Sequence, residues 1–268
     1  MIRDITIGQY YQTESVVHSL DPRVKLLATL VYIISLFLAD GIVGYGIAAF
    51  FLIASIMLSK VPAKYILKGL KSIVFILIFS GLFIVLFTSG EHMLAEFWIF
   101  TISREGIFNA VEMVFRLMLL IVGSSVMTLT TTPTDIADGL EKAFSPLKKI
   151  KVPVHEMAMM ISIAFRFIPI LIDETDKIMK AQIARGADFE SGNLFKKAKS
   201  MVPLLVPLFI SAFRRANDLA MAMEARCYQG GEGRTKMKPL IYKKRDVIAY
   251  IIVVVYLAAC IVVGRILF

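Results

Sequence analysis

The chain has 268 residues, of which 57% are apolar and only 19% are charged, and its net charge is +9. A water-soluble domain of this length rarely has so few charges, so the composition indicates a membrane protein that crosses the bilayer several times. The two cysteines, Cys227 and Cys260, lie far apart in different kinds of segment and offer neither a disulfide framework nor a metal-ligand spacing.

The first 23 residues are polar. They include Arg3, Asp4 and Glu14 and contain no apolar stretch that could form the core of a cleavable signal peptide. We therefore expect residues 1–23 to be a cytoplasmic N-terminal segment.

Residues 24–130 contain four apolar stretches, and one more follows near the C-terminus. They cover residues 24–39, 42–58, 73–88, 107–130 and 247–267. A helix needs about 20 residues to cross the hydrocarbon, so the first three are short, but they carry almost no internal charge. The first two meet at Asp40 and Gly41, which predicts a tight helical hairpin. We expect a four-span membrane bundle over 24–130 and a C-terminal transmembrane helix over 246–268.

Basic residues indicate how the spans are oriented. The lysine loop, which we define as residues 60–71, carries Lys60, Lys64, Lys68 and Lys71, whereas Arg104 is the only basic residue in 89–105. By the positive-inside rule the lysine loop is cytoplasmic, which with five spans also places 131–245 inside. The net charge then reflects orientation and contact with anionic membrane lipid or an acidic partner, and we expect no nucleic acid partner.

Residues 131–245 form the one long polar-rich region and predict cytoplasmic helices. Two apolar stretches within it, 154–172 and 201–213, run directly into charged sequence, and the first has Arg166 in its middle. Because an arginine that faces lipid is costly, we expect long helices along the cytoplasmic boundary. A pair of true spans is the alternative.

Two arginine tripeptides stand out in this region. Ala184-Arg185-Gly186 and Ala225-Arg226-Cys227 lie 41 residues apart, and each closes a run that favours helix. Arginine followed by a small residue and then turn residues is typical of a helix C-terminus. The simpler interpretation is that each arginine complements a helix dipole. The repetition of the tripeptide favours a docking role for both.

The chain contains no recognisable catalytic motif. It has no phosphate-binding loop, no HExxH pair and no GxSxG elbow, and its three histidines lie in unrelated segments. The acidic run from Asp173 to Asp176 lacks a second acidic cluster and is typical of a solvated helix face. Arg116, inside the fourth span, is expected to snorkel or to pair within the bundle. We therefore expect no catalytic site, no metal site and no cofactor.

Several segments, taken in order, resemble one known family. They are Arg3 to Tyr10, Leu20 to Leu26, Phe165 to Pro169 with Glu174, and the two arginine tripeptides. Together they resemble the transmembrane T component of energy-coupling-factor (ECF) transporters. The resemblance implies an all-α polytopic membrane helix bundle with long cytoplasmic coupling helices, in the cell membrane of a bacterium or archaeon.

The resemblance also implies partners and a site. A T component joins a substrate-binding S component to two ABC-type ATPases, for uptake of vitamins or related micronutrients. The residues that dock the ATPases would be Ala184, Arg185, Gly186, Ala225, Arg226 and Cys227, with Cys227 where glycine is frequent in the family.

Two other functions stay open. One is a T component dedicated to cobalt or nickel. The other is a stand-alone secondary transporter, which the scarcity of charges inside the spans and the lack of paired broken spans disfavour.

Overall fold

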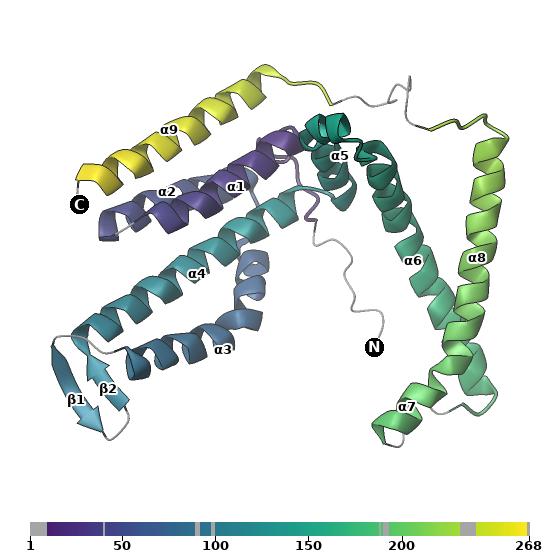
Figure 1. The fold of residues 1–268 in the computed structure, drawn as a ribbon, viewed down its shortest axis with the longest axis horizontal. Helices are drawn as coiled ribbons and strands as arrows, with labels where there is room; N and C mark the ends of the chain where they lie inside the picture. Colours follow the sequence, from purple (N-terminus) through teal and green to yellow (C-terminus); the bar gives the residue numbers. More distant parts are fainter. Residues whose placement is uncertain are drawn as a thin grey trace. The chain divides into compact units, whose positions relative to one another are not determined.

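The computed structural model describes residues 10–39, 41–88, 92–97, 100–187, 189, 193–230 and 240–266. The elements are α1 (Pro22–Leu38), α2 (Gly41–Ser59), α3 (Ala63–Phe87), β1 (Met93–Phe97), β2 (Phe100–Ser103), α4 (Arg104–Thr130), α5 (Pro133–Ala143), η2 (Ser145–Ile150), α6 (Val154–Ala184), α7 (Leu194–Ser200), α8 (Val202–Glu224) and α9 (Lys244–Ile266). Helices dominate, which confirms the predicted all-α class (Figure 1).

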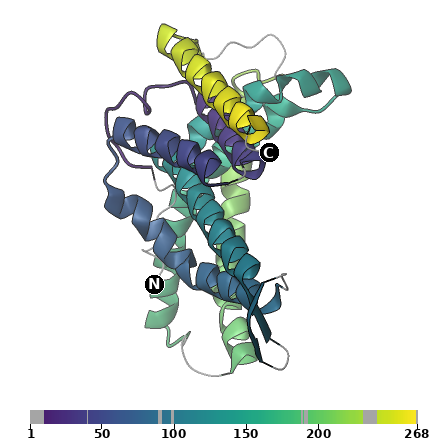
Figure 2. The ribbon, with the colours of Figure 1, turned by 90° about the vertical axis from the view of Figure 1, so that its left-hand side faces the viewer.

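The chain forms two compact units. The membrane unit comprises residues 8–139 and 240–268, and the helix-pair unit comprises residues 1–7 and 140–239. In the membrane unit α4 packs against α1, α2 and α3, and α9 packs against α1 and α2. The long helices α3 and α4 lie side by side in both ribbon views (Figure 1, Figure 2).

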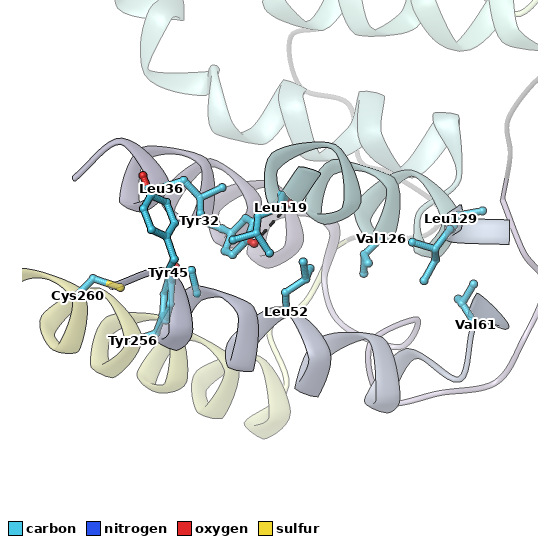
Figure 3. Close-up of a cluster of buried hydrophobic side chains, with 12 residues drawn as sticks. Tyr32, Leu36, Tyr45, Leu52, Val61, Leu119, Val126, Leu129, Tyr256 and Cys260 are labelled. Atoms are coloured by element: carbon cyan, nitrogen blue, oxygen red, sulfur yellow. Dashed lines mark hydrogen bonds between the residues drawn. The ribbon is translucent and has the colours of Figure 1, made fainter. Parts of the chain in front are cut away.

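The core of the membrane unit is a cluster of buried side chains from α1, α2, the start of α3 with the residue Val61 before it, α4 and α9 (Figure 3). Phe51 stacks on Tyr256 with ring centroids 4.3 Å apart. The hydroxyl of Tyr256 is hydrogen-bonded to Ser35, and that of Tyr32 donates to the carbonyl of Leu119. Both tyrosines can lie inside an apolar bundle because their polar ends have partners.

The outer faces of the membrane unit are apolar. Phe50 and Phe75 are 75% and 79% exposed, and many leucines, isoleucines and valines of α1, α2, α3 and α9 are exposed too. Such a surface would make a soluble protein aggregate, but it matches the hydrocarbon of a bilayer.

Length and composition single out α2, α4, α6 and α9 as helices that could span a membrane. The helix α3 is bent by 54° between its lysine-bearing segment Ala63–Lys71 and its apolar segment Ile73–Phe87. The bend separates the charged part of the helix from the apolar part. At 17 residues α1 is slightly shorter than these helices. The helix α6 is long and apolar enough to span a membrane, whereas its sequence predicts a position along the cytoplasmic boundary, so the position of α6 stays a prediction.

The connection after α3 differs from the expected loop. The strands β1 and β2 form an antiparallel hairpin in which Met93 pairs with Ser103 and Phe97 with Phe100. The aromatic and β-branched residues of 97–102 carry a strand signal that the sequence analysis missed. The predicted break between the first two stretches is confirmed, because α1 ends at Leu38 and α2 begins at Gly41.

Three helix ends meet at one edge of the membrane unit. The ammonium of Lys25, at the start of α1, donates to the carbonyls of His18 and Thr130, at 3.1 and 2.9 Å. The carboxylate of Asp246, at the start of α9, accepts from the backbone N–H of Asp21. These buried bonds hold the starts of α1 and α9 and the end of α4 together.

Arg116 pairs within the bundle, as one of its two predicted interpretations stated. Its guanidinium donates to the carboxylate of Glu112 and to the hydroxyl of Tyr45. One arginine inside an apolar helix is thereby neutralised by a partner one turn away.

Candidate functional site: two arginine-bearing helix ends

The helix α6 ends in a hydrogen-bonded turn around Arg185. The N–H of Gly186 donates to the carbonyl of Ile183 at 2.9 Å, and the N–H of Ala187 donates to that of Gln182 at 3.0 Å. Gly186 has a φ of +84°, in the left-handed region that glycine adopts without a steric cost. This pair of bonds is the Schellman motif, and it places Arg185 at the cap position directly after the last helical residue, Ala184.

The helix α8 ends in the same motif around Arg226. The N–H of Cys227 donates to the carbonyl of Glu224 at 2.9 Å, and the N–H of Tyr228 donates to that of Met223 at 3.1 Å. Cys227 has a φ of +53°, so it takes the position that Gly186 takes in the first motif. Left-handed geometry costs a residue with a Cβ about 1–2 kcal/mol, yet Cys227 adopts it. The second motif therefore has the same backbone conformation as the first, although cysteine replaces glycine.

The two arginines are presented to solvent in equivalent positions. Both side chains are exposed, and neither has a hydrogen bond or an ion pair within the described ranges. Each helix also carries an exposed apolar side chain in its last turn, Ile183 in α6 and Met221 in α8. Each helix end thus offers an unpaired guanidinium, and the turn before it carries an exposed apolar side chain.

The helices α6 and α8 run in opposite directions beside each other (Figure 1). The side-chain amide of Gln182, near the end of α6, lies 3.4 Å from the carbonyl of Pro203, near the start of α8. Farther along, Arg215 of α8 donates to the carboxylate of Glu174 of α6, with Nη2 and Oε2 3.0 Å apart. Arg185 and Arg226 consequently lie at opposite ends of the pair.

The two arginines lie equally far along the chain from the Glu174–Arg215 contact. Arg185 follows Glu174 by eleven residues, and Arg226 follows Arg215 by eleven residues. At about 1.5 Å per helical residue, each arginine lies about 16 Å along its own helix from the Glu174–Arg215 contact. The two tripeptides are thus related by an approximate two-fold arrangement centred on this ion pair.

Sequence reasoning predicted part of this site. The two predicted helix ends are confirmed, whereas the docking role of Ala184, Arg185, Gly186, Ala225, Arg226 and Cys227 stays a prediction. It missed the role of Glu174, which was assigned to a solvated face, and the role of Arg215. A signal was present, because aligning the two tripeptides on their arginines also aligns Glu174 with Arg215.

Comparison with known proteins identifies the family. A family model described as cobalt transport protein, CbiQ, matches residues 13–237. The chain is 55% identical over 250 residues to the energy-coupling factor transporter transmembrane protein EcfT of Clostridium kluyveri, covering 93% of each chain. It is 49% identical over 268 residues to the protein of that name from Ruminiclostridium cellulolyticum, covering all of both, and 45% identical over 259 residues to that from Bacillus subtilis, covering 97% of both. The chain therefore belongs to the family of energy-coupling factor transporter transmembrane proteins, as a T component that resides in the bacterial membrane with several helices.

Proposed function

We propose that this T component transmits ATP hydrolysis by two cytoplasmic ABC-type ATPases to a substrate-binding S component, and that it has no catalytic site of its own. The observation that carries the proposal is the pair of exposed arginines, held by the same backbone motif at the two ends of one helix pair. An arginine that only complements its own helix dipole would not explain why the same motif occurs at both helix ends.

Arginine suits a docking contact for physical reasons. Its planar guanidinium stays charged and can donate to two acceptors at once, which fixes direction as well as distance. Arg185 and Arg226 have these donors free in the described part of the chain. An acidic groove on each ATPase would pair with one guanidinium, and Ile183 or Met221 would be covered beside it.

The spacing of the two ends fits a pair of partners better than a single one. The arginines are about 33 Å apart as measured along the two helices, since each lies about 16 Å from the crossing contact. The approximate two-fold arrangement about Glu174 and Arg215 would meet two ATPases that are themselves arranged as a pair. Each ATPase would then hold one arginine.

Docking to cytoplasmic partners requires that residues 131–245 lie on the cytoplasmic side. Arg166, in the middle of the apolar part of α6, is exposed and has no ion pair among the described residues. Only 6% of the apolar window of α6 is buried in protein, against 22% for α2, α4 and α9. If α6 crossed the bilayer, Arg166 would face lipid at a cost of several kcal/mol, which favours a position along the boundary.

The S component would determine the substrate, which we propose to be a vitamin or a related micronutrient. A cobalt- or nickel-dedicated transporter is the second candidate, because the matching family model is described as a cobalt transport protein. Purification from mild detergent separates the two. A single metal-binding S component would support the second candidate, and several S components would support a shared T component.

The docking proposal is tested by reversing the arginine charges. Removing one side of a buried hydrogen-bonded charge pair costs roughly 2–5 kcal/mol, so Arg185→Glu and Arg226→Glu should each weaken ATPase binding by at least about 30-fold. Lysine at either position should give an intermediate loss. Matched controls are Lys180→Glu on α6 and Arg214→Glu on α8, two exposed cations on the same helices.

Binding of the ATPases and uptake of a labelled vitamin are measured at matched membrane levels. The purified chain alone should hydrolyse no ATP, and hydrolysis should appear when the ATPases are added. The proposal is wrong if both reversals bind and transport like the unaltered chain, or if the two controls fail equally.

A further inference from the structure

The membrane unit contains an apolar cavity of about 300 Å³. Its walls come from residues 16–32 before and within α1, residues 51–58 of α2, residues 123–130 of α4 and residues 245–253 of α9. Val24, Leu52 and Val126 form the inner wall, while Leu58, Ile248 and Ile252 lie exposed at its edge. The size is within the range of small-molecule sites, and the exposed apolar edge would face the bilayer.

Apart from Arg245, the polar side chains in this wall already have partners. The ammonium of Lys25 and the hydroxyls of Thr29, Tyr32, Ser55 and Thr130 each donate to a backbone carbonyl. None of these donor groups has to find its partner in the cavity. An occupant made of hydrocarbon therefore fits this space, because a polar one would lose its hydration without recovering hydrogen bonds.

A second, polar pocket of about 600 Å³ adjoins the first. It is lined by Tyr10, Thr13, Glu14, Ser15, Val16, His18, Ser19, Lys60 and Arg245. Val16 and Arg245 also line the apolar cavity, so the two spaces share an edge. One molecule with a polar end and an apolar chain could occupy both.

The charges of the polar pocket favour an anion. Arg245 donates from Nη1 to Ser19 Oγ at 2.6 Å, and its other donors have no partner in the described residues. Lys60 is exposed and forms no ion pair there, and Glu14 is the one acidic residue of the lining. Burial lowers the pKa of His18 below its usual 6.5, and Lys25 acts in the same direction, so His18 adds no charge at neutral pH. The lining is therefore net positive.

We propose that the two pockets bind one anionic phospholipid, with its phosphate at Arg245 and Lys60 and one acyl chain in the apolar cavity. Lys60 begins the lysine loop, so the lipid would belong to the cytoplasmic leaflet. The site joins the start of α9 to the segment before α1, and lipid binding would strengthen this contact. The proposal does not depend on the docking role of the arginines, because every lining residue lies in the membrane unit.

The test uses the full chain, purified in mild detergent, delipidated and titrated with phosphatidylglycerol or phosphatidylcholine of identical acyl chains. Native mass spectrometry counts the lipids retained per chain. We expect one retained phosphatidylglycerol. Two basic residues near a phosphate contribute about 30-fold in affinity, so Lys60→Gln with Arg245→Gln should lose about that factor. The matched control is Lys64→Gln with Lys244→Gln, two exposed lysines outside both pockets.

A second pair of variants tests the acyl chain. Ala28→Phe fills the apolar cavity and should weaken binding of the same lipid at least about tenfold, whereas Ala258→Phe on an exposed part of α9 should not. If Ala28→Phe does not fold, the charge variants decide alone.

Three results would overturn the proposal. The first is equal binding of the two lipids, or an equal loss in the control pair. The second is full competition by inorganic phosphate, which would identify an anion site without a lipid. The third is the absence of lipid from the transporter assembled with its ATPases and S component, which would identify the cavity as a protein interface.

Discussion

Exchanging the charges at the crossing of α6 and α8 tests whether the ion pair fixes the two arginine ends. Glu174→Arg alone would place two arginines against each other, and Arg215→Glu alone would place two glutamates together. The double exchange would restore an ion pair with its direction reversed. We expect both single variants to be defective in coupling and the double variant to recover.

The magnitude follows from the geometry of the pair. Its atoms are 3.0 Å apart, but the side chains of Arg215 and Glu174 are 37% and 27% exposed, so water screens the attraction. A pair of this kind contributes about 0.5 kcal/mol, and a reversal adds a repulsion of similar size. Each single exchange should therefore cost about 1 kcal/mol, or about a fivefold loss in the population with the helices in register. A slip by one turn would displace one arginine from the other by about 5 Å, which a two-donor contact does not tolerate.

The assay is the number of labelled substrate molecules taken up per ATP hydrolysed, in vesicles with matched amounts of each subunit. The control is the same exchange at the adjacent exposed residues, Asp173→Arg with Arg214→Glu, which form no ion pair in the described structure. The reasoning is refuted if the double exchange at Glu174 and Arg215 is as defective as the single ones. It is also refuted if the control exchange is equally defective.

Further predictions follow from the membrane unit. In a Cys227→Ser background, a cysteine replacing Glu96 should react with an impermeant thiol reagent outside intact cells, whereas one in the lysine loop should not; the reverse pattern would invert the topology. The lowered pKa of His18, due first to burial, gives stability that is present above pH 6.5 and is lost as the pH falls, since the unfolded chain then binds the proton more readily. Thermal unfolding in detergent should show this loss as the pH falls below about 6.5, and His18→Gln should reduce it. Gly123→Val should destabilise by about 1–3 kcal/mol, because an added Cβ would meet the buried tyrosine ring of α1 at 2.8 Å or closer, whereas Gly46→Val, which meets no atom within 4 Å, should be nearly neutral.

Local signals made the helix ends predictable. A Schellman turn depends on a few consecutive residues, so the run from Gln182 to Ala187 contains nearly all the information that forms it. Apolar composition likewise predicted α2, α4 and α9 as helices that could span a membrane, because the bilayer requires an uninterrupted apolar stretch.

Contacts between distant segments were not predictable in the same way. The Glu174–Arg215 pair depends on how α6 and α8 are aligned, which neither helix sequence specifies alone. The apolar cavity arises because four separate segments leave space between them. The position of α6 is ambiguous for a physical reason, since its apolar length favours a span while Arg166 opposes one.

The equal spacing of the arginines from the crossing contact has a mechanical consequence. A rotation of α6 against α8 about Glu174 and Arg215 moves Arg185 and Arg226 along arcs of the same length. With arms of about 16 Å, a rotation of about 10° displaces each end by about 3 Å. The helix pair therefore behaves as a hinge about this contact, in which a displacement of one arginine-bearing end is matched by a displacement of equal size at the other. If each arginine docks one ATPase, as proposed, the geometry of the crossing would hold the two ATPases to displacements of equal size.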